Sequence, residues 1–147
     1  MQSNIYLSIP GMSGDVIASP FKYQIAVQSF SWEMAQPLDP ATGQLEGSVN
    51  TPVFTIQALS GSHSPLLWKA MIANSQLATT GYVTLTVTET DAGATDAVMT
   101  YKLNNCFCGS YSPSCDIGSA GPTEVFTILA GKVQAGWSGN YVQWPTL

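Results

Sequence analysis

Hydrophobic and polar residues alternate along most of the chain, with the period of two that is typical of half-buried β-strands. The clearest example is residues 82–90, in which aliphatic side chains alternate with threonines. The same pattern predicts further strands over residues 4–9, 21–34, 52–59, 98–106 and 124–134. Gly131 interrupts the last of these, and a glycine inside a strand pattern is typical of a bulge or bend.

One segment has the period of a helix instead. Ser64 is a suitable N-cap, Pro65 suits the first helical position, and apolar residues then recur four apart until about Asn74. Roughly seven strands and one helix predict a mainly β protein: a small closed barrel or sandwich with the helix over one opening. We expect a single domain over residues 1–147.

One strand breaks its own alternation. In the stretch VQSFSWEMAQP, Val27 is apolar at an odd position, whereas Phe30 and Trp32 are apolar at even positions. A change of phase by one residue moves side chains to the opposite face of a sheet. We interpret the change as a switch of the buried face along this strand, and a bulge near residues 27–29 is one way to make it.

Two connections are long and lack periodicity, over residues 37–51 and 109–123. Both are rich in proline, glycine and small polar residues. Loops longer than about 12 residues in a compact domain are usually functional or disordered. These two segments are therefore candidates for contacts with other molecules.

Charge is scarce in this chain. Only 9% of residues are charged, against about a quarter in ordinary soluble domains. There is no arginine, and the net charge is −5. Because phosphates are neutralised by lysine and arginine, the composition argues against a nucleic-acid partner. Interface cores are depleted of charge, so extensive self-association is one interpretation, and a secreted monomer rich in serine and threonine is the other.

Neither a membrane span nor a secretion signal is indicated. No run approaches the ~18 apolar residues that a membrane helix needs. The first residues, MQSNIYLSIPGMSG, lack the basic and apolar regions of a signal peptide. We expect no membrane insertion and no export by the general signal-peptide route, and export by another route remains open.

Residues for catalysis are few. His63 is the only histidine, and a serine–histidine pair also needs an orienting carboxylate and a nucleophile on a strained turn. No G-x-S-x-G motif occurs, and the nine carboxylates are scattered. We therefore predict that His63 is an ordinary loop histidine, and that the protein is not an enzyme and holds no cofactor or metal.

The sequence has one cluster of cysteines that could form a metal site or a disulfide: Cys106, Cys108 and Cys115. A metal site would need a fourth ligand, and the histidine is distant in sequence. Reduced thiols and a disulfide between Cys115 and either other cysteine are the remaining interpretations. Such a disulfide would form only in an oxidising compartment.

An ordered series of segments resembles the haemolysin-coregulated protein (Hcp) family, which supplies the inner-tube subunit of bacterial type VI secretion systems. SWEM is the most distinctive string. The segments occur in family order over nearly the whole chain, and they are NIYLSIPGMSGD, VQSFSWEMAQP, SPLLWKAM, YVTLTV, YKLNNCFCGSYS and TEVFTILAGKVQ.

The resemblance implies a β-barrel of two packed antiparallel sheets with one α-helix at its side. It also implies a homo-hexameric ring, stacking of rings into a tube, and effectors carried in the lumen. The partners implied are further copies of the chain and sheath, spike and effector proteins. The protein would be assembled in the cytoplasm and secreted without a signal peptide.

The resemblance also assigns roles to residues. Ser29, Ser31 and Glu33 would face the lumen, while Phe30, Trp32 and Met34 fill the barrel core. The long loop would couple one ring to the next through Pro37, Leu38, Asp39, Gly43, Gln44, Leu45, Glu46, Gly47 and Val49.

The alternative is a monomeric β-sandwich binding module, of a carbohydrate-binding or adhesin-like kind. The tryptophan, tyrosine and threonine content would suit such a module. It predicts that Trp137 or Trp144 is exposed beside a ligand cleft.

Overall fold

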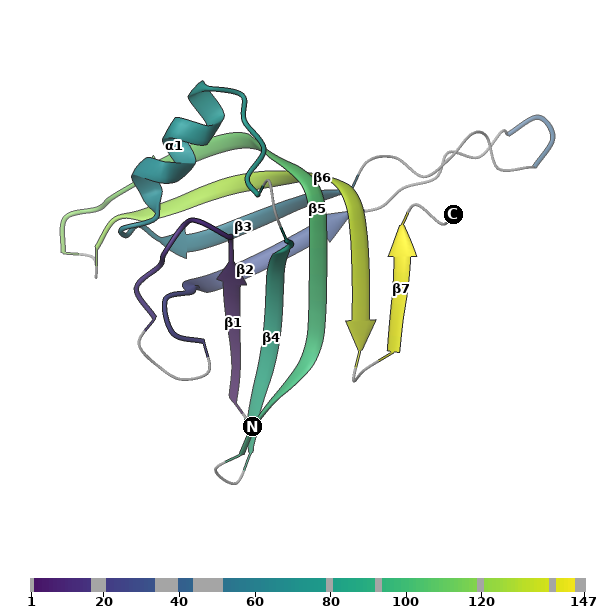
Figure 1. Ribbon diagram of the computed structural model, residues 1–147, viewed down its shortest axis with the longest axis horizontal. Coiled ribbons are helices and arrows are strands. Elements are labelled where there is room, and N and C mark those ends of the chain that lie inside the picture. The colour runs from purple at the N-terminus through teal and green to yellow at the C-terminus, as the bar shows by residue number, and fades with distance from the viewer. Residues whose placement is uncertain are drawn as a thin grey trace.

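The computed structural model describes residues 2–16, 21–33, 40–43, 52–78, 81–91, 94–118, 121–137 and 140–144 (Figure 1). Strands make up most of the described chain, and one helix lies between the third and fourth of them. The elements are β1 (Gln2–Ser8), β2 (Ile25–Glu33), β3 (Val53–Leu59), α1 (Ser64–Ile72), β4 (Val83–Asp91), β5 (Ala94–Ser114), β6 (Thr123–Trp137) and β7 (Asn140–Trp144).

The strands form a closed antiparallel barrel. Their order is β3-β2-β1-β4-β5-β6-β7, and β3 pairs with β6 as well. This second pairing closes β1 to β6 into a barrel, while β7 adds to the last part of β6. The predicted mainly β barrel with one helix is therefore confirmed.

A bulge in β2 explains the phase change that the sequence shows. Val27 pairs with Ala58 and Ser29 pairs with Gln57, so Gln28 is an extra residue with no partner of its own on β3. Val27 is buried before the bulge, and Trp32 packs against the same core after it. A bulge near residues 27–29 was one of the open interpretations of the sequence, and the structure has it. The expected switch of buried face is wrong, because the extra residue restores the original face.

The long strands β5 and β6 bend together at Asn105 and Gly131. On β5 the buried residues change from the odd positions Tyr101 and Leu103 to the even position Cys106. Asn105 between them has a left-handed φ of 52°. A β-carbon on Gly131 would stand 2.9 Å from the Asn105 Cβ, which leaves room for glycine alone. The bend predicted at Gly131 is confirmed, and there both strands pass from one side of the barrel to the other.

Aromatic side chains fill the barrel at one end. The Trp32 and Phe54 rings stack with centroids 5.4 Å apart, and Tyr101 meets both rings edge-on. Trp32 Nε1 donates a hydrogen bond to the Tyr101 hydroxyl over 3.1 Å. Because the indole N–H has an acceptor, the half-buried tryptophan packs without an unsatisfied polar group.

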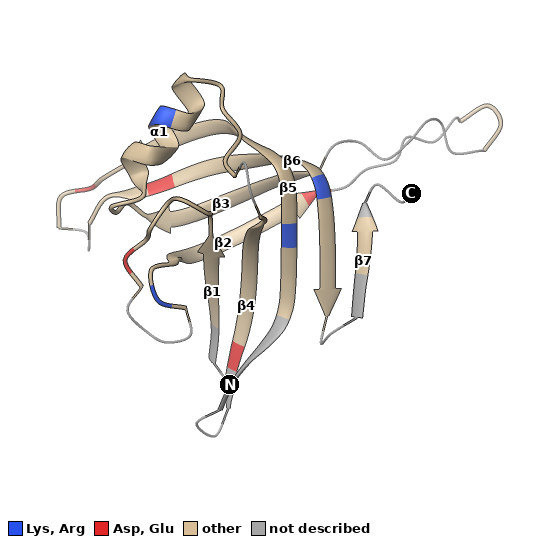
Figure 2. Ribbon diagram, in the orientation of Figure 1, with Lys and Arg blue, Asp and Glu red and all other residues tan. Residues whose placement is uncertain are grey.

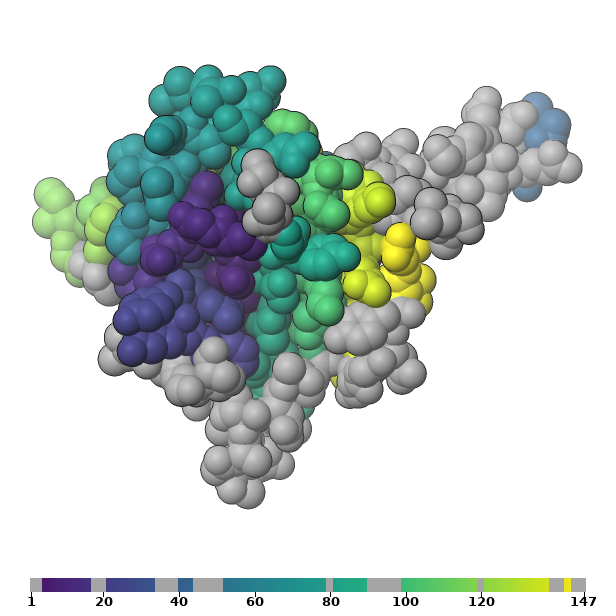
Figure 3. Space-filling model, viewed as in Figure 1, coloured from purple at the N-terminus to yellow at the C-terminus, as the bar shows by residue number. Residues whose placement is uncertain are grey.

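Helix α1 covers the other end of the barrel, where it forms one extremity of the molecule (Figures 1 and 3). Leu67 and Ala70 point into the core. Ser64 is the first helical residue and not the N-cap, which is His63. The helix ends at Ile72 with Ala73 as its C-cap, close to the predicted end.

Candidate functional site

The three polar residues predicted to leave the core do so. Ser29, Ser31 and Glu33 are exposed on β2, on the face opposite Phe30 and Trp32. They alternate with these aromatic residues because β2 is regular after its bulge. Their place on the outer face of the barrel wall is the starting point for the site.

Strand register continues this face across four strands as a row of hydroxyl groups. Ser31 pairs with Thr55 of β3, and Thr55 pairs with Thr127 of β6. Thr127 in turn pairs with Ser110 of β5, and their hydroxyl oxygens are 2.9 Å apart. Directly paired residues present their side chains on the same face of a sheet. One row of hydroxyl groups therefore crosses β2, β3, β6 and β5.

A second row runs parallel to the first. Ser29 pairs with Gln57, Gln57 with Val125, and Val125 with Ser112. The Ser29 hydroxyl donates to Gln57 Oε1 over 3.3 Å. Beyond these rows Ser114 pairs with Thr123, and their hydroxyl oxygens are 3.1 Å apart. We call the two rows and this pair the hydroxyl face, and its polar members are Ser29, Ser31, Thr55, Gln57, Ser110, Ser112, Ser114, Thr123 and Thr127.

The hydroxyl face carries almost no charge. Glu33, at one end of it, is the one charged side chain among the described residues that point outward from these four strand segments. Charged positions are few on the ribbon as a whole (Figure 2). Groups that contact this face would therefore meet hydrogen-bonding hydroxyls and short aliphatic side chains rather than ion pairs.

Gly109 allows β5 to join this face. The register of β5 against β6 shifts between Cys108 and Ser110, so Gly109 is a bulge. A β-carbon there would stand 2.9 Å from Thr127 Oγ1 and 3.0 Å from Leu129 Cγ. The loop predicted over residues 109–123 is thus partly wrong, because β5 continues to Ser114 and β6 begins at Thr123.

The four strand segments that carry the hydroxyl face form a sheet with two open edges. β1 pairs with β2 only over Ile25–Val27 among the described residues, so residues 29–33 of β2 have β3 as their one partner strand. Beyond Cys106, β5 pairs with β6 alone within the described ranges. Pro113 lies on this second edge, and proline within a sheet is confined largely to edges. Unpaired edges favour pairing with another chain.

A buried polar network lies behind the hydroxyl face, where α1 meets the barrel. Glu124 of β6 is fully buried, and its Oε1 accepts a hydrogen bond from His63 Nε2 over 2.5 Å. Ser64 Oγ donates to Glu124 Oε2 over 3.0 Å, and the Tyr111 hydroxyl donates to the same oxygen. The carboxylate thereby joins the start of α1 to β5 and β6.

These contacts set the protonation state of the carboxyl group. Burial alone would raise the pKa of Glu124, but hydrogen bonds from His63, Tyr111 and Ser64 outweigh burial and hold that pKa below its ordinary value. Burial and the hydrogen bond to Glu124 raise the pKa of the Tyr111 phenol. The network therefore holds an ionised carboxylate surrounded by donors.

His63 was predicted to be an ordinary loop histidine, and that prediction is wrong because the side chain is 2% exposed. The Ser64 hydroxyl bonds to the carboxylate and not to the imidazole, which is unlike a nucleophile–base pair. His63 and Glu124 are 61 residues apart, so no local motif reveals their contact. Their arrangement fixes the helix to the barrel.

The three cysteines are free thiols in the structure. Cys106 is buried, Cys108 is half-buried and Cys115 is exposed. Burial raises the pKa of Cys106 to about 12, which makes its thiol unreactive at neutral pH. A disulfide to Cys115 would require the segment after Cys108 to turn back, whereas this segment runs on as part of β5 and all three thiols are free.

Other predicted positions are described only in part. Of the nine loop residues expected to couple rings, Gly43 is described and is exposed, whereas the other eight lie outside the described residues, as does Met34. Trp137 is 56% exposed and lines a cavity of about 230 Å³ with Trp32 and Tyr101, whereas the side chain of Trp144 lies outside the description.

Two further findings concern the described residues alone. No helix among them is long and apolar enough to cross a membrane. Within the same ranges, no three histidine, cysteine, aspartate or glutamate side chains gather as metal ligands would.

Fold and site together define a small antiparallel barrel that has an open-edged, nearly uncharged sheet on one side and a helix at one end. A family model described as type VI secretion system effector, Hcp, matches residues 6–137. The chain belongs to this family. No curated protein matches the sequence.

Solved structures of Hcp proteins share the fold. A structure described as a type six secretion system protein superposes with a TM-score of 0.83 at 19% identity, over 97% of this chain and 95% of its own. A structure of Hcp1 mutants from E. coli EAEC 042 superposes with a TM-score of 0.80 at 19% identity, over 97% of both chains. The secreted protein Hcp3 from Pseudomonas aeruginosa superposes with a TM-score of 0.70 at 16% identity, also over 97% of both chains. Family and fold together support a type VI secretion system tube protein.

Proposed function

We propose that six copies of this chain form a ring, that rings stack into a tube, and that the tube carries effector proteins in its lumen. The observation that carries the proposal is the open-edged sheet with its hydroxyl face, in a chain of the Hcp family. The protein acts mechanically, as a conduit and a carrier, and not as an enzyme.

Strand direction supports ring closure. Adjacent strands in the sheet β2-β3-β6-β5 are antiparallel, so β2 and β5 at its two edges run in opposite directions. A second copy, rotated about an axis along the strands, would place its β2 beside the first copy's β5 and continue the antiparallel order. Such a head-to-tail contact between different surfaces closes into a ring when the rotation allows it.

The hydroxyl face would then line the lumen. In a ring joined at the β2 and β5 edges, one face of the sheet points to the barrel core and the other to the bore. Ser29, Ser31 and Glu33 would meet the cargo there. The low charge of the chain supports the assembly, because protein surfaces that become interface cores are depleted of charge.

The long loop would couple one ring to the next. Residues 34–52 connect β2 and β3, and the described stretch within this loop, residues 40–43, is exposed and distant from α1 (Figure 1). Deleting residues 43–49 is expected to leave single rings but to abolish tubes, because the ring edges are unchanged while the contact along the axis is lost. Negative-stain electron microscopy distinguishes the two states.

A second variant distinguishes the effect of the loop's sequence from the effect of its length. Replacing residues 43–49 with a glycine–serine linker of equal length should abolish tubes as the deletion does, and rings should persist in both. Tubes formed by the deletion variant would contradict the role proposed for this loop.

The wider context follows from the family. The tube protein would be assembled in the cytoplasm and leave the cell without a signal peptide. Its partners would be further copies of itself, sheath and spike proteins around and ahead of the tube, and effectors inside it.

A monomeric binding module is the second candidate, and one observation favours it. Trp137 is exposed beside the cavity of about 230 Å³, as that interpretation predicts. The two candidates differ in their mass in solution, a hexamer or larger against a monomer.

A further inference from the structure

We propose that a cavity beside His63 binds a primary ammonium group carried on a short alkyl chain. The cavity has a volume of about 270 Å³ and lies where the β1–β2 connection meets the end of β3 and the start of α1. This inference concerns a single protomer and does not depend on ring formation. The lining residues are Asp15, Val16, Ile25, Ala26, Leu59, Ser60 and His63.

The first acceptor in this cavity is the unused nitrogen of His63. Nε2 bonds to the ionised Glu124, so in the neutral form of the imidazole, which this proposal requires, the proton is on Nε2 and the lone pair is on Nδ1. Nδ1 is buried and has no hydrogen-bond partner among the described residues. A buried acceptor without a partner is costly, and such atoms are rare in folded proteins. A donor supplied by a ligand would remove this deficit.

The second acceptor is the carboxylate of Asp15. The Ser62 hydroxyl donates to its Oδ1 over 2.7 Å, and the Ser62 backbone N–H donates to its Oδ2 over 3.2 Å. These hydrogen bonds lower the pKa of Asp15, so the group is negatively charged at neutral pH. The carboxylate is therefore held in place and charged at the cavity, where it favours a cation.

Gly61 lets the Asp15 carboxylate approach His63 closely, because a glycine has no side chain at the position that Asp15 Oδ2 crowds. A β-carbon on Gly61 would collide with Asp15 Oδ2 and would stand 3.5 Å from His63 Nδ1. Ser60 adds a third acceptor, because its hydroxyl makes only a long 3.5 Å hydrogen bond to Glu124 and keeps its lone pairs. A primary ammonium has three N–H donors, which matches three acceptors.

The rest of the cavity suits an alkyl chain. Its other walls are the apolar side chains of Val16, Ile25, Ala26 and Leu59. A carboxylate at one end of an apolar cavity is complementary to an alkylammonium and not to a carboxylate or phosphate ligand.

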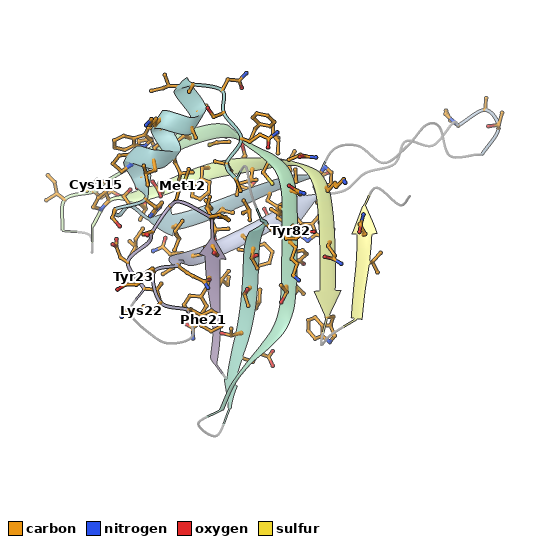
Figure 4. All side chains as sticks on the ribbon, in the orientation of Figure 1. Met12, Phe21, Lys22, Tyr23, Tyr82 and Cys115 are labelled. Atoms are coloured by element: carbon orange, nitrogen blue, oxygen red, sulfur yellow. The ribbon has the colours of Figure 1, made fainter. Side chains whose placement is uncertain are left out.

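The chain's own nearby lysine does not fill the cavity. Lys22 lies on the same β1–β2 connection, but its Nζ stands 5.0 Å from the centroid of the Tyr23 ring, and both side chains lie at the outer side of this connection (Figure 4). Lys22 is not among the lining residues. The ammonium would come from a lysine side chain of another protein or from a free alkylamine.

The single histidine makes the proposal directly testable. The protein is labelled with ¹⁵N at histidine only and titrated with n-butylamine at neutral pH. The Nδ1 resonance of His63 should shift in a saturable way, with a Kd of about 1 mM for so small a ligand. n-Butanol, which has no charge, and tetramethylammonium, which has no N–H donor, should give no saturable shift.

Two variants test the geometry. Asp15→Asn should weaken butylamine binding about tenfold by removing the charge. Asp116→Asn removes an exposed carboxylate elsewhere and should leave binding unchanged. A wild-type protein without a saturable shift, or equal binding by the Asp15→Asn variant, would overturn the proposal.

The source of the ammonium is tested with a second probe. If the cavity serves a protein lysine, Nα-acetyl-lysine amide should bind at least as tightly as n-butylamine. If it serves a free amine, the added peptide groups should weaken binding. Both outcomes leave the ammonium site in place and decide between its two sources.

Discussion

Replacing Glu124 with glutamine is expected to lower the free energy of unfolding by about 3 kcal/mol, because the substitution breaks a buried charged network. Glutamine keeps the shape of the side chain but replaces the charged carboxylate that accepts hydrogen bonds from His63 and Tyr111. Its amide NH₂ group also adds two donors at a point where other donors already converge. Urea unfolding followed by tryptophan fluorescence measures the loss. The matched control is Glu33→Gln on the exposed face, which should change stability by no more than about 0.5 kcal/mol.

The ionised carboxylate of Glu124 should also make the stability of the protein depend on pH in the acid range. Because the folded state lowers the pKa of Glu124, its contribution to stability is complete above the unfolded value of about 4.3 and is lost as pH falls through the lower folded value. Wild-type stability should therefore decline as pH falls below about 4.3, and the Glu124→Gln variant should decline less steeply. Parallel declines in the two proteins would show that the carboxylate is not held ionised by its donors.

Deleting Gln28 should unfold the protein or nearly so. Without the extra residue, β2 cannot direct both Val27 and Trp32 into the core, and one end of the strand must expose its apolar side chains. Exposing two large side chains costs about 3–6 kcal/mol, which is a large share of the stability of a small domain. Circular dichroism and the urea midpoint measure the effect.

A substitution at the same position provides the control. Gln28→Gly keeps the residue count and therefore the bulge, so its stability should stay close to that of the wild type. A deletion variant with a wild-type midpoint would mean that β2 reaches the core without the bulge.

Alternation of side chains was sufficient to predict a mainly β protein, a barrel or a sandwich, and it failed where a bulge changes the phase. In β2, the pattern around Gln28 is the same whether a strand exchanges its buried face or inserts a bulge. Only the pairing with β3 decides between them. In β5, Gly109 and the surrounding serines contain too few apolar residues to show a strand, so the second half of β5 was assigned to a loop.

In the candidate site, some residues could also be predicted from the sequence and others could not. Ser31 and its neighbours on β2 could be placed outside the core from local alternation. Thr55, Thr127 and Ser110 join them only through register between strands that are distant in sequence. The cavity beside His63 depends on contacts from three separate segments, and no local pattern in the sequence marks it.

The mass of the protein in solution tests the central claim most directly. Sedimentation velocity over a range of concentrations should show a species of about six subunits, or larger stacks of such rings. A species of 15.6 kDa that persists at all concentrations would contradict the ring, and with it the lumen and the carrier role.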